Sequence, residues 1–131
     1  MFANARVATT LPIADLDRAI KFYANTLGLK PLEAPYPGFE SEMALFEAGD
    51  CSQFLLYRQE APANGHRDHT AASFQVEDLD AAIATLEERG VSMEQYDQPG
   101  LKTDERGIVT MGPMRGVWFK DPEGNILSVV E

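Results

Sequence analysis

Six residues near the start of the chain recur in its second half. Residues 15–20 are Asp-Leu-Asp-Arg-Ala-Ile and residues 78–83 are Asp-Leu-Asp-Ala-Ala-Ile, so five of the six are identical. Each copy follows a run typical of a β-strand, 7–13 or 70–76, and opens a run with helical spacing of apolar residues. Self-similarity at about half the chain length predicts two copies of one supersecondary unit.

Both copies carry the signals of helix ends. Asp15 and Asp78 are good N-caps, and Gly28 and Gly90 follow the apolar stripes and predict where the helices stop. The remaining β-rich runs give a βαβββ order in each half. The expected strands are 6–13, 29–34, 42–47 and 53–58, then 70–76, 91–96, 108–111, 115–120 and 126–130, with a polar loop at 97–106.

Length and charge limit the possible classes of protein. A chain of 131 residues, 44% of them hydrophobic, predicts one soluble domain, 1–131, made of module one (1–60), a linker (59–68) and module two (69–131). The net charge of −10 repels phosphate backbones, so no nucleic-acid partner is expected. No apolar run reaches the roughly 20 residues of a membrane helix, so no membrane partner is expected either.

Cys51 is the only cysteine, and the first residues lack the pattern of a secretory signal, which favours a cytoplasmic protein.

Three segments carry a resemblance. They are 15–29, its echo at 78–90, and 119–127, which is Phe-Lys-Asp-Pro-Glu-Gly-Asn-Ile-Leu. Together they resemble the vicinal oxygen chelate superfamily of glyoxalases, bleomycin resistance proteins and extradiol dioxygenases. The resemblance implies an α+β fold in which two paired βαβββ modules with curved mixed sheets form a cup, with the helices outside. Modules pair within one chain or by exchange between two chains, and both remain open. A sheet edge that needs covering predicts a homodimer.

The resemblance also locates the metal ligands of the metal-using members. There, a His from the first strand of each module and a carboxylate from the last converge on one divalent ion. Here the four positions fall at Ala8, Leu56, Ala71 and Ser128, with a slip of one residue left open at Leu56. Methyl groups and a hydroxyl bind a hard cation poorly or not at all. We therefore expect no metal and no cofactor.

Substitute ligands are few. His69 lies two residues before Ala71 and would share its face, displaced by roughly 7 Å. Glu131 lies three residues after Ser128, and its opposite parity turns it away. His66 and His69 have a spacing of three, but in a glycine-containing linker they are more simply two solvent-facing histidines.

Strand alternation and the resemblance suggest a ligand set. The first-strand positions put Thr10 and Ser73 inside the cup, and Trp118 offers a large ring for stacking. The expected ligand-binding residues are Thr10, Leu56, Ser73, Trp118 and Ser128. Alternatively, these side chains are core residues that fill the cup themselves. For Trp118, ligand binding and core packing both remain open.

The segment 95–106 is either a lid over the cup or a plain surface loop with Tyr96 packed beneath it. The sequence predicts a metal-independent protein that binds a small drug-like or metabolite molecule, similar to the bleomycin-resistance branch. The alternative is a lyase, isomerase or dioxygenase of the same superfamily that uses a metal held by atypical ligands or a metal-free acid–base pair. Whether the protein is an enzyme, and which ligand it takes, are left open.

Overall fold

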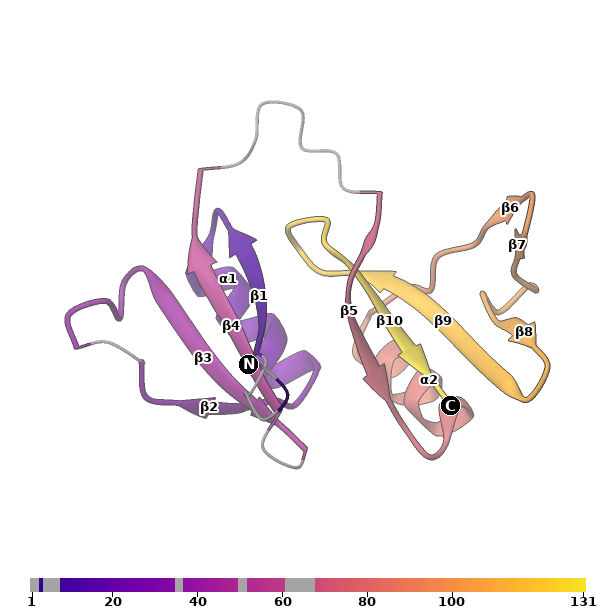
Figure 1. Ribbon diagram of the computed structural model, residues 1–131, viewed down its shortest axis with the longest axis horizontal. Coiled ribbons are helices and arrows are strands. Elements are labelled where there is room, and N and C mark those ends of the chain that lie inside the picture. The colour runs from indigo at the N-terminus through magenta and orange to yellow at the C-terminus, as the bar shows by residue number, and fades with distance from the viewer. Residues whose placement is uncertain (1–2, 4–7, 35–36, 50–51, 61–67) are drawn as a thin grey trace. The chain divides into compact units, whose positions relative to one another are not determined.

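The computed structural model describes residues 3, 8–34, 37–49, 52–60 and 68–131. The chain divides into two compact units, Met1–Gly65 and His66–Glu131 (Figure 1). Most of the expected linker, 61–67, and part of the first expected strand, 6–7, lie outside the described residues. Within the described part of the chain, no helix has the length and apolar character needed to cross a membrane.

The first unit is a four-stranded mixed sheet with one helical segment. In chain order its elements are β1 (Ala8–Ile13), α1 (Leu16–Lys21), η1 (Phe22–Thr26), β2 (Lys30–Leu32), β3 (Met43–Ala48) and β4 (Ser52–Arg58). The sheet order is β1-β4-β3-β2, with β1 parallel to β4 and the other pairs antiparallel.

The helix starts where the sequence predicts and ends in a wider turn than expected. The side chain of Asp15 accepts a hydrogen bond from the Arg18 backbone N–H at 3.0 Å, which satisfies one of the free donors of the first turn. The last five residues form a π-helical turn, in which Leu27 N–H donates to the Phe22 carbonyl at 3.0 Å. Gly28 follows with φ 73°.

Aromatic side chains fill the core between this helix and its sheet. Tyr23 has no exposed area, and its ring centroid lies 4.9 Å from that of Phe54 and 6.2 Å from that of Phe46. Phe54 and Phe46 are cross-strand partners on β4 and β3. This face of the first sheet is therefore the helix-facing side, and the other face points away from the core.

The second unit repeats this plan. In chain order its elements are β5 (Thr70–Gln75), α2 (Leu79–Glu88), β6 (Asp97–Gln98), β7 (Leu101–Lys102), β8 (Val109–Met111), β9 (Met114–Lys120) and β10 (Ile126–Val130). The sheet order β5-β10-β9-β8 matches that of the first unit position by position, and α2 packs on β10 (Figure 1). The predicted α+β fold with two βαβββ units is confirmed.

The strand expected at 91–96 is wrong. This segment is irregular, and Glu94 N–H donates a hydrogen bond to the Trp118 carbonyl at 2.7 Å without forming a strand pair. The edge position belongs to β8 instead. A contact with a later part of the chain accompanies this: the chain returns over the segment at Gly107, where an added Cβ would lie 2.8 Å from the Glu94 carbonyl oxygen and 2.9 Å from the Met93 Cβ. The returning loop is packed closely against residues 93–94.

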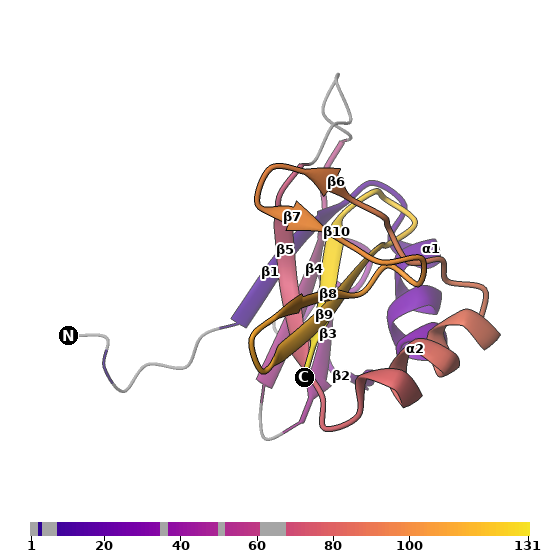
Figure 2. The ribbon, with the colours of Figure 1, turned by 90° about the vertical axis from the view of Figure 1, so that its right-hand side faces the viewer.

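The polar loop at 97–106 contains a small hairpin. Strands β6 and β7 pair as Asp97 with Lys102 and Gln98 with Leu101, around the Pro99-Gly100 turn. The hairpin forms its own two-stranded sheet, outside the four-stranded one. Figure 2 shows it at the end of the second unit where β5 and β10 begin.

Candidate functional site

Three of the residues predicted to bind a ligand lie in one row across the second sheet. Ser128 on β10 is in register with Ser73 on β5 and with Trp118 on β9. Residues in register on neighbouring strands present their side chains on the same face. Ser128 Oγ–H donates to Ser73 Oγ at 2.7 Å, which confirms that the two hydroxyls meet. The opposite face carries Leu127 and Val129, both buried against α2.

A β-bulge changes which residue of β5 joins this face. The register with β10 runs from Thr70 opposite Ile126 to Ala72 opposite Leu127, so it skips Ala71. Strict alternation would place Ala71 on the same face as Ser73. The extra residue of a bulge instead shifts the alternation for the residues that precede it. Thr70, in register with Ile126, therefore joins this face, and the Trp118 Nε1–H donates to its Oγ1 at 3.1 Å.

A hollow of about 370 Å³ lies over this end of the sheet, within the second unit. The rings of Tyr96 and Trp118 stand perpendicular to each other, at 88°, with centroids 5.6 Å apart. They form an aromatic corner, while Gln98 and Leu101 of the hairpin supply a further wall. The lining residues are Asp68, Thr70, Glu94, Tyr96, Gln98, Leu101, Trp118, Lys120 and Ile126.

Two turns hold the walls in place. At the base of the hairpin, Tyr96 N–H donates to Thr103 Oγ1 at 2.8 Å and Thr103 N–H donates to the Tyr96 carbonyl at 2.9 Å. Between β9 and β10, the buried Asp121 accepts from the backbone N–H of Asn125 at 2.8 Å and from its side-chain Nδ2 at 2.7 Å. This turn fixes the end of β9 against the start of β10, where Lys120 and Ile126 enter the hollow.

The charges of the hollow are mixed. Lys120 Nζ lies 3.8 Å from Glu94 Oε1, and Asp68 adds a second carboxylate. Burial, followed by the negative charge of Glu94, raises the pKa of the Tyr96 phenol above its ordinary value. The phenol therefore stays neutral at physiological pH and keeps its O–H as a donor.

In the first unit, the two predicted site residues lie on different faces. Thr10 is exposed and in register with Leu55, while Leu56 has no exposed area and is on the same side as Phe54. Phe54 contacts Tyr23 of the helical segment, so Leu56 belongs to the core of its unit. A shift of one residue, which the sequence left open, makes Leu55 the neighbour of Thr10.

The residues at the family's metal positions do not fit a divalent ion. Ala8 and Ala71 carry no donor atom, and the Ser128 hydroxyl is bonded to Ser73. Hard cations are held by carboxylate, carbonyl or imidazole groups. Across the described residues, no group of three or more His, Cys, Asp or Glu side chains is placed to hold a metal; His66 lies outside this part of the chain.

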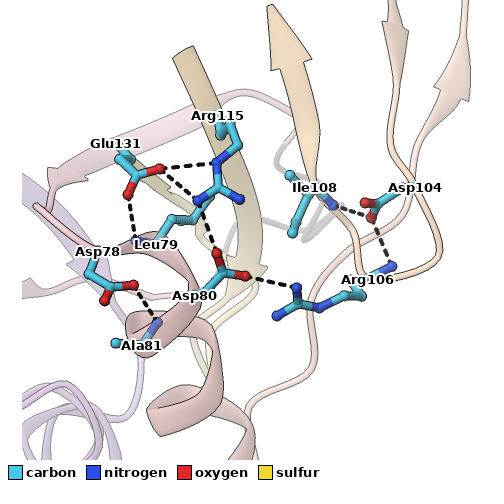
Figure 3. Close-up of polar contacts among 9 residues, drawn as sticks. All are labelled: Asp78, Leu79, Asp80, Ala81, Asp104, Arg106, Ile108, Arg115 and Glu131. Atoms are coloured by element: carbon cyan, nitrogen blue, oxygen red, sulfur yellow. Dashed lines mark hydrogen bonds and ion pairs between the residues drawn. The ribbon is translucent and has the colours of Figure 1, made fainter. Parts of the chain in front are cut away.

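Glu131, the other substitute considered, is engaged in a different cluster (Figure 3). Its carboxylate binds Arg115 at 2.7 Å and accepts from the Leu79 N–H at 3.3 Å. Arg115 and Arg106 both bind Asp80, at 3.0 and 2.8 Å. Hydrogen bonds from Arg106 and then Arg115 lower the pKa of Asp80, and hydrogen bonds to Glu131 and then Asp80 raise the pKa of Arg115. The cluster links the start of α2 to β9, to the loop before β8 and to the end of β10.

Comparison with known proteins agrees with this architecture. The family model of the glyoxalase/bleomycin resistance protein/dioxygenase superfamily matches residues 6–129. The chain therefore belongs to this superfamily.

Solved structures show the same fold. A superfamily member from Sphaerobacter thermophilus is 25% identical, with a TM-score of 0.70 over 100% of this chain and 99% of that one. A glyoxalase/bleomycin resistance protein from Streptomyces sp. CB03234 is 24% identical, with a TM-score of 0.68 over 97% and 100%. The fosfomycin resistance protein FosX from Mesorhizobium loti is 15% identical, with a TM-score of 0.66 over 97% and 91%.

The sequence missed several residues of the hollow. Lys120 follows Trp118 by two positions, so alternation along β9 was sufficient to find it. Thr70 and Glu94 gave no such signal, because one depends on the bulge and the other on the irregular segment. Tyr96 was noticed only as part of the loop, which in fact contributes both Gln98 and Leu101 to the hollow.

Proposed function

We propose that the protein binds a small drug-like or metabolite molecule without a metal ion, and that the hollow over Trp118 is part of its binding site. The observation that carries this proposal is the corner formed by Tyr96 and Trp118, with Leu101 and Ile126 beside it. Pockets for small molecules are concave, mostly apolar and carry a few placed polar groups, with volumes of about 300–1,000 Å³. The volume of the hollow lies at the lower end of that range, and Tyr96, Leu101, Trp118 and Ile126 give it apolar surface beside five polar or charged lining residues.

Hydroxyls next to the aromatic corner add specificity. Thr70 lines the hollow, and Ser73 and Ser128 continue the same face along the sheet. Replacing metal ligands by methyls and hydroxyls leaves a surface that recognises a guest by shape and hydrogen bonds rather than by coordination.

Trp118 provides a direct test, because it is the only tryptophan of the chain. Its single indole N–H resonance reports on the hollow, and it is bonded to Thr70 in the free protein. Chelator-treated protein is titrated with quinoline, a neutral flat probe. We expect a saturable shift of the indole resonance that added nickel, zinc, manganese or iron does not change. Tyr96→Ala is expected to weaken binding about two- to tenfold, since stacking on an aromatic ring is worth roughly 0.5–1.5 kcal/mol. Met111→Ala, an exposed apolar position on β8, serves as the control.

Elemental analysis of the purified protein separates the proposal from its enzymatic alternative. Near-stoichiometric metal that is lost in His69→Ala, with probe binding dependent on that metal, would overturn metal independence. It would instead favour a lyase, isomerase or dioxygenase with unusual ligands. The likeness to FosX does not decide between these, because at 15% identity it shows the fold alone.

We also propose that the protein is cytoplasmic, that both modules form one domain, 1–131, and that the chain forms a homodimer. The sheet topology supports the dimer: β1 and β5 each lie at the edge of their own sheet, and strand edges that are not covered favour pairing. Sedimentation of the purified chain tests this, and a monomer at micromolar concentration would exclude the dimer.

A further inference from the structure

We infer that the hollow over Trp118 takes a flat organic cation, and that Lys120 acts as an internal competitor for the same carboxylate. This inference rests on the proposed function and specifies its ligand class. It follows from the charges, the ring geometry and the Glu94–Lys120 contact.

The lining favours positive charge. Apart from Tyr96, the ionisable lining residues are two carboxylates, Asp68 and Glu94, and one ammonium, Lys120. The two rings present π-faces, whose negative quadrupole attracts cations within about 6 Å of the ring centre. An anion in this hollow would meet both carboxylates and would have to draw Lys120 away from Glu94.

The geometry favours a flat guest. Because Tyr96 and Trp118 stand at 88° to each other, a planar ring stacked on one of them meets the other with its edge. A positively polarised ring edge against an aromatic face is the favoured arrangement of aromatic pairs. Leu101 and Ile126 border the same space with apolar surface. A planar heteroaromatic cation satisfies both rings and one carboxylate at once.

Lys120 already occupies the position of such a cation. Its Nζ lies 3.8 Å from Glu94 Oε1, well beyond the 2.7–2.9 Å of a charge-assisted hydrogen bond. The Lys120 side chain is 49% exposed and the Glu94 side chain 33%, so the pair is solvated and weak. A guest cation held by the rings as well as by Glu94 displaces Lys120, which moves into solvent on its flexible stem.

Three probes of nearly equal shape test the ligand class. They are 1-methylquinolinium, neutral quinoline and quinoline-4-carboxylate, each titrated against the indole N–H resonance of Trp118. We expect the cation to bind about five-fold or more tightly than the neutral probe, and the anion to bind most weakly. Equal affinity for cation and neutral probe, or tightest binding of the carboxylate, would overturn the cation inference and leave the proposed function standing. If none of the probes shifts the resonance, the proposed function itself fails.

Two variants test whether Lys120 competes with the guest for Glu94, and we expect them to change the affinity in opposite directions. Glu94→Gln is expected to lower the affinity for 1-methylquinolinium about five-fold, and Lys120→Gln to raise it about three-fold. Affinity for neutral quinoline should change little in either. Glu88→Gln on α2 and Lys102→Gln on β7 remove the same charges at positions that do not line the hollow, and should leave all three affinities nearly unchanged. A Lys120→Gln protein that keeps its thermal stability yet binds the cation less tightly would contradict the role assigned to Lys120.

Discussion

Gly107 is a position where the returning loop packs closely against the irregular segment that borders the hollow. Replacing it with alanine adds one methyl group, and the new Cβ would lie 2.8 Å from the Glu94 carbonyl oxygen and 2.9 Å from the Met93 Cβ. Neither neighbour is the end of a flexible side chain, so the backbone itself has to move. Gly107 also has φ 81°, a left-handed conformation that alanine adopts at a cost.

The expected loss of stability has two parts. The left-handed conformation costs alanine about 1–2 kcal/mol, and the lower entropy of the unfolded chain returns about 0.4–1 kcal/mol. The steric overlap adds about 1–3 kcal/mol, the usual range for overpacking. Gly107→Ala should therefore destabilise the folded state by about 2–4 kcal/mol.

Gly90→Ala is the matched control. Gly90 has φ 82°, almost the same as Gly107, but an added Cβ there meets no atom within 4 Å. Its substitution should cost only the conformational part, about 1 kcal/mol or less. The difference between the two variants isolates the overlap with the segment at 93–94.

Urea unfolding followed by the fluorescence of Trp118 measures both variants, because this residue lies in the same unit as the two glycines. With a urea m-value of about 2 kcal/mol per molar, the midpoint of Gly107→Ala should lie about 1 M below that of Gly90→Ala. Equal midpoints would show that residues 93–94 do not pack against the loop as described. The same variant should also shift the Trp118 indole resonance, since Glu94 N–H bonds to the Trp118 carbonyl.

Three further outcomes are expected. Asp78→Ala should lower the free energy of unfolding by about 1 kcal/mol and Asp78→Asn by much less, in thermal melts, because asparagine keeps the N-cap acceptor. Leu56→Ala should cost about 2–5 kcal/mol in urea unfolding and Leu55→Ala clearly less; similar costs would contradict the helix-facing position of Leu56. Because the folded-state pKa of Asp80 is lowered, the stability it contributes is present above its unfolded pKa, near 4, and disappears as the pH falls through the folded value. Melts of wild type and Asp80→Asn should therefore converge at low pH, and also at high salt; a gap that persists in both would exclude the pairing with Arg106 as its cause.

Much of the fold followed from local signals in the sequence. The repeated Asp-Leu-Asp motif placed both helix starts, because an aspartate N-cap satisfies backbone donors without help from distant residues. The last strand was predicted at the observed bounds, since a dense β-branched run follows a turn fixed by Asp121 and Asn125. Gly112-Pro113 correctly separated β8 from β9.

Where the sequence misled, a long-range contact had overruled a local pattern. Residues 91–96 have the composition of a strand, but the returning loop at Gly107 takes up the adjacent space and β8 takes the edge. Strict alternation along β5 predicts that Ala71 lies on the same face as Ser73. Because the register skips Ala71, the residues before it lie on the opposite face from the one that alternation predicts, and Thr70 takes the place beside the hollow. Leu55, not Leu56, is in register with Thr10 on the outward face, and the sequence alone left this shift of one residue open.

The candidate site was predictable only in part, for the same reason. Ser73, Ser128 and Trp118 are cross-strand neighbours. Alternation pointed to Ser73, the resemblance to Ser128, and the position before the final turn to Trp118. Glu94, Tyr96 and the hairpin reach the hollow through irregular backbone, for which no periodic rule exists.

The hairpin β6–β7 stands apart from the four strands that build the second sheet, yet it supplies a wall of the hollow. One wall of the hollow therefore comes from a stretch that is not part of the duplicated four-stranded plan. Under the proposed function, substitutions confined to residues 97–102 would change how a guest fits against this wall, while Trp118 and the strand pairs of the second sheet stay as they are.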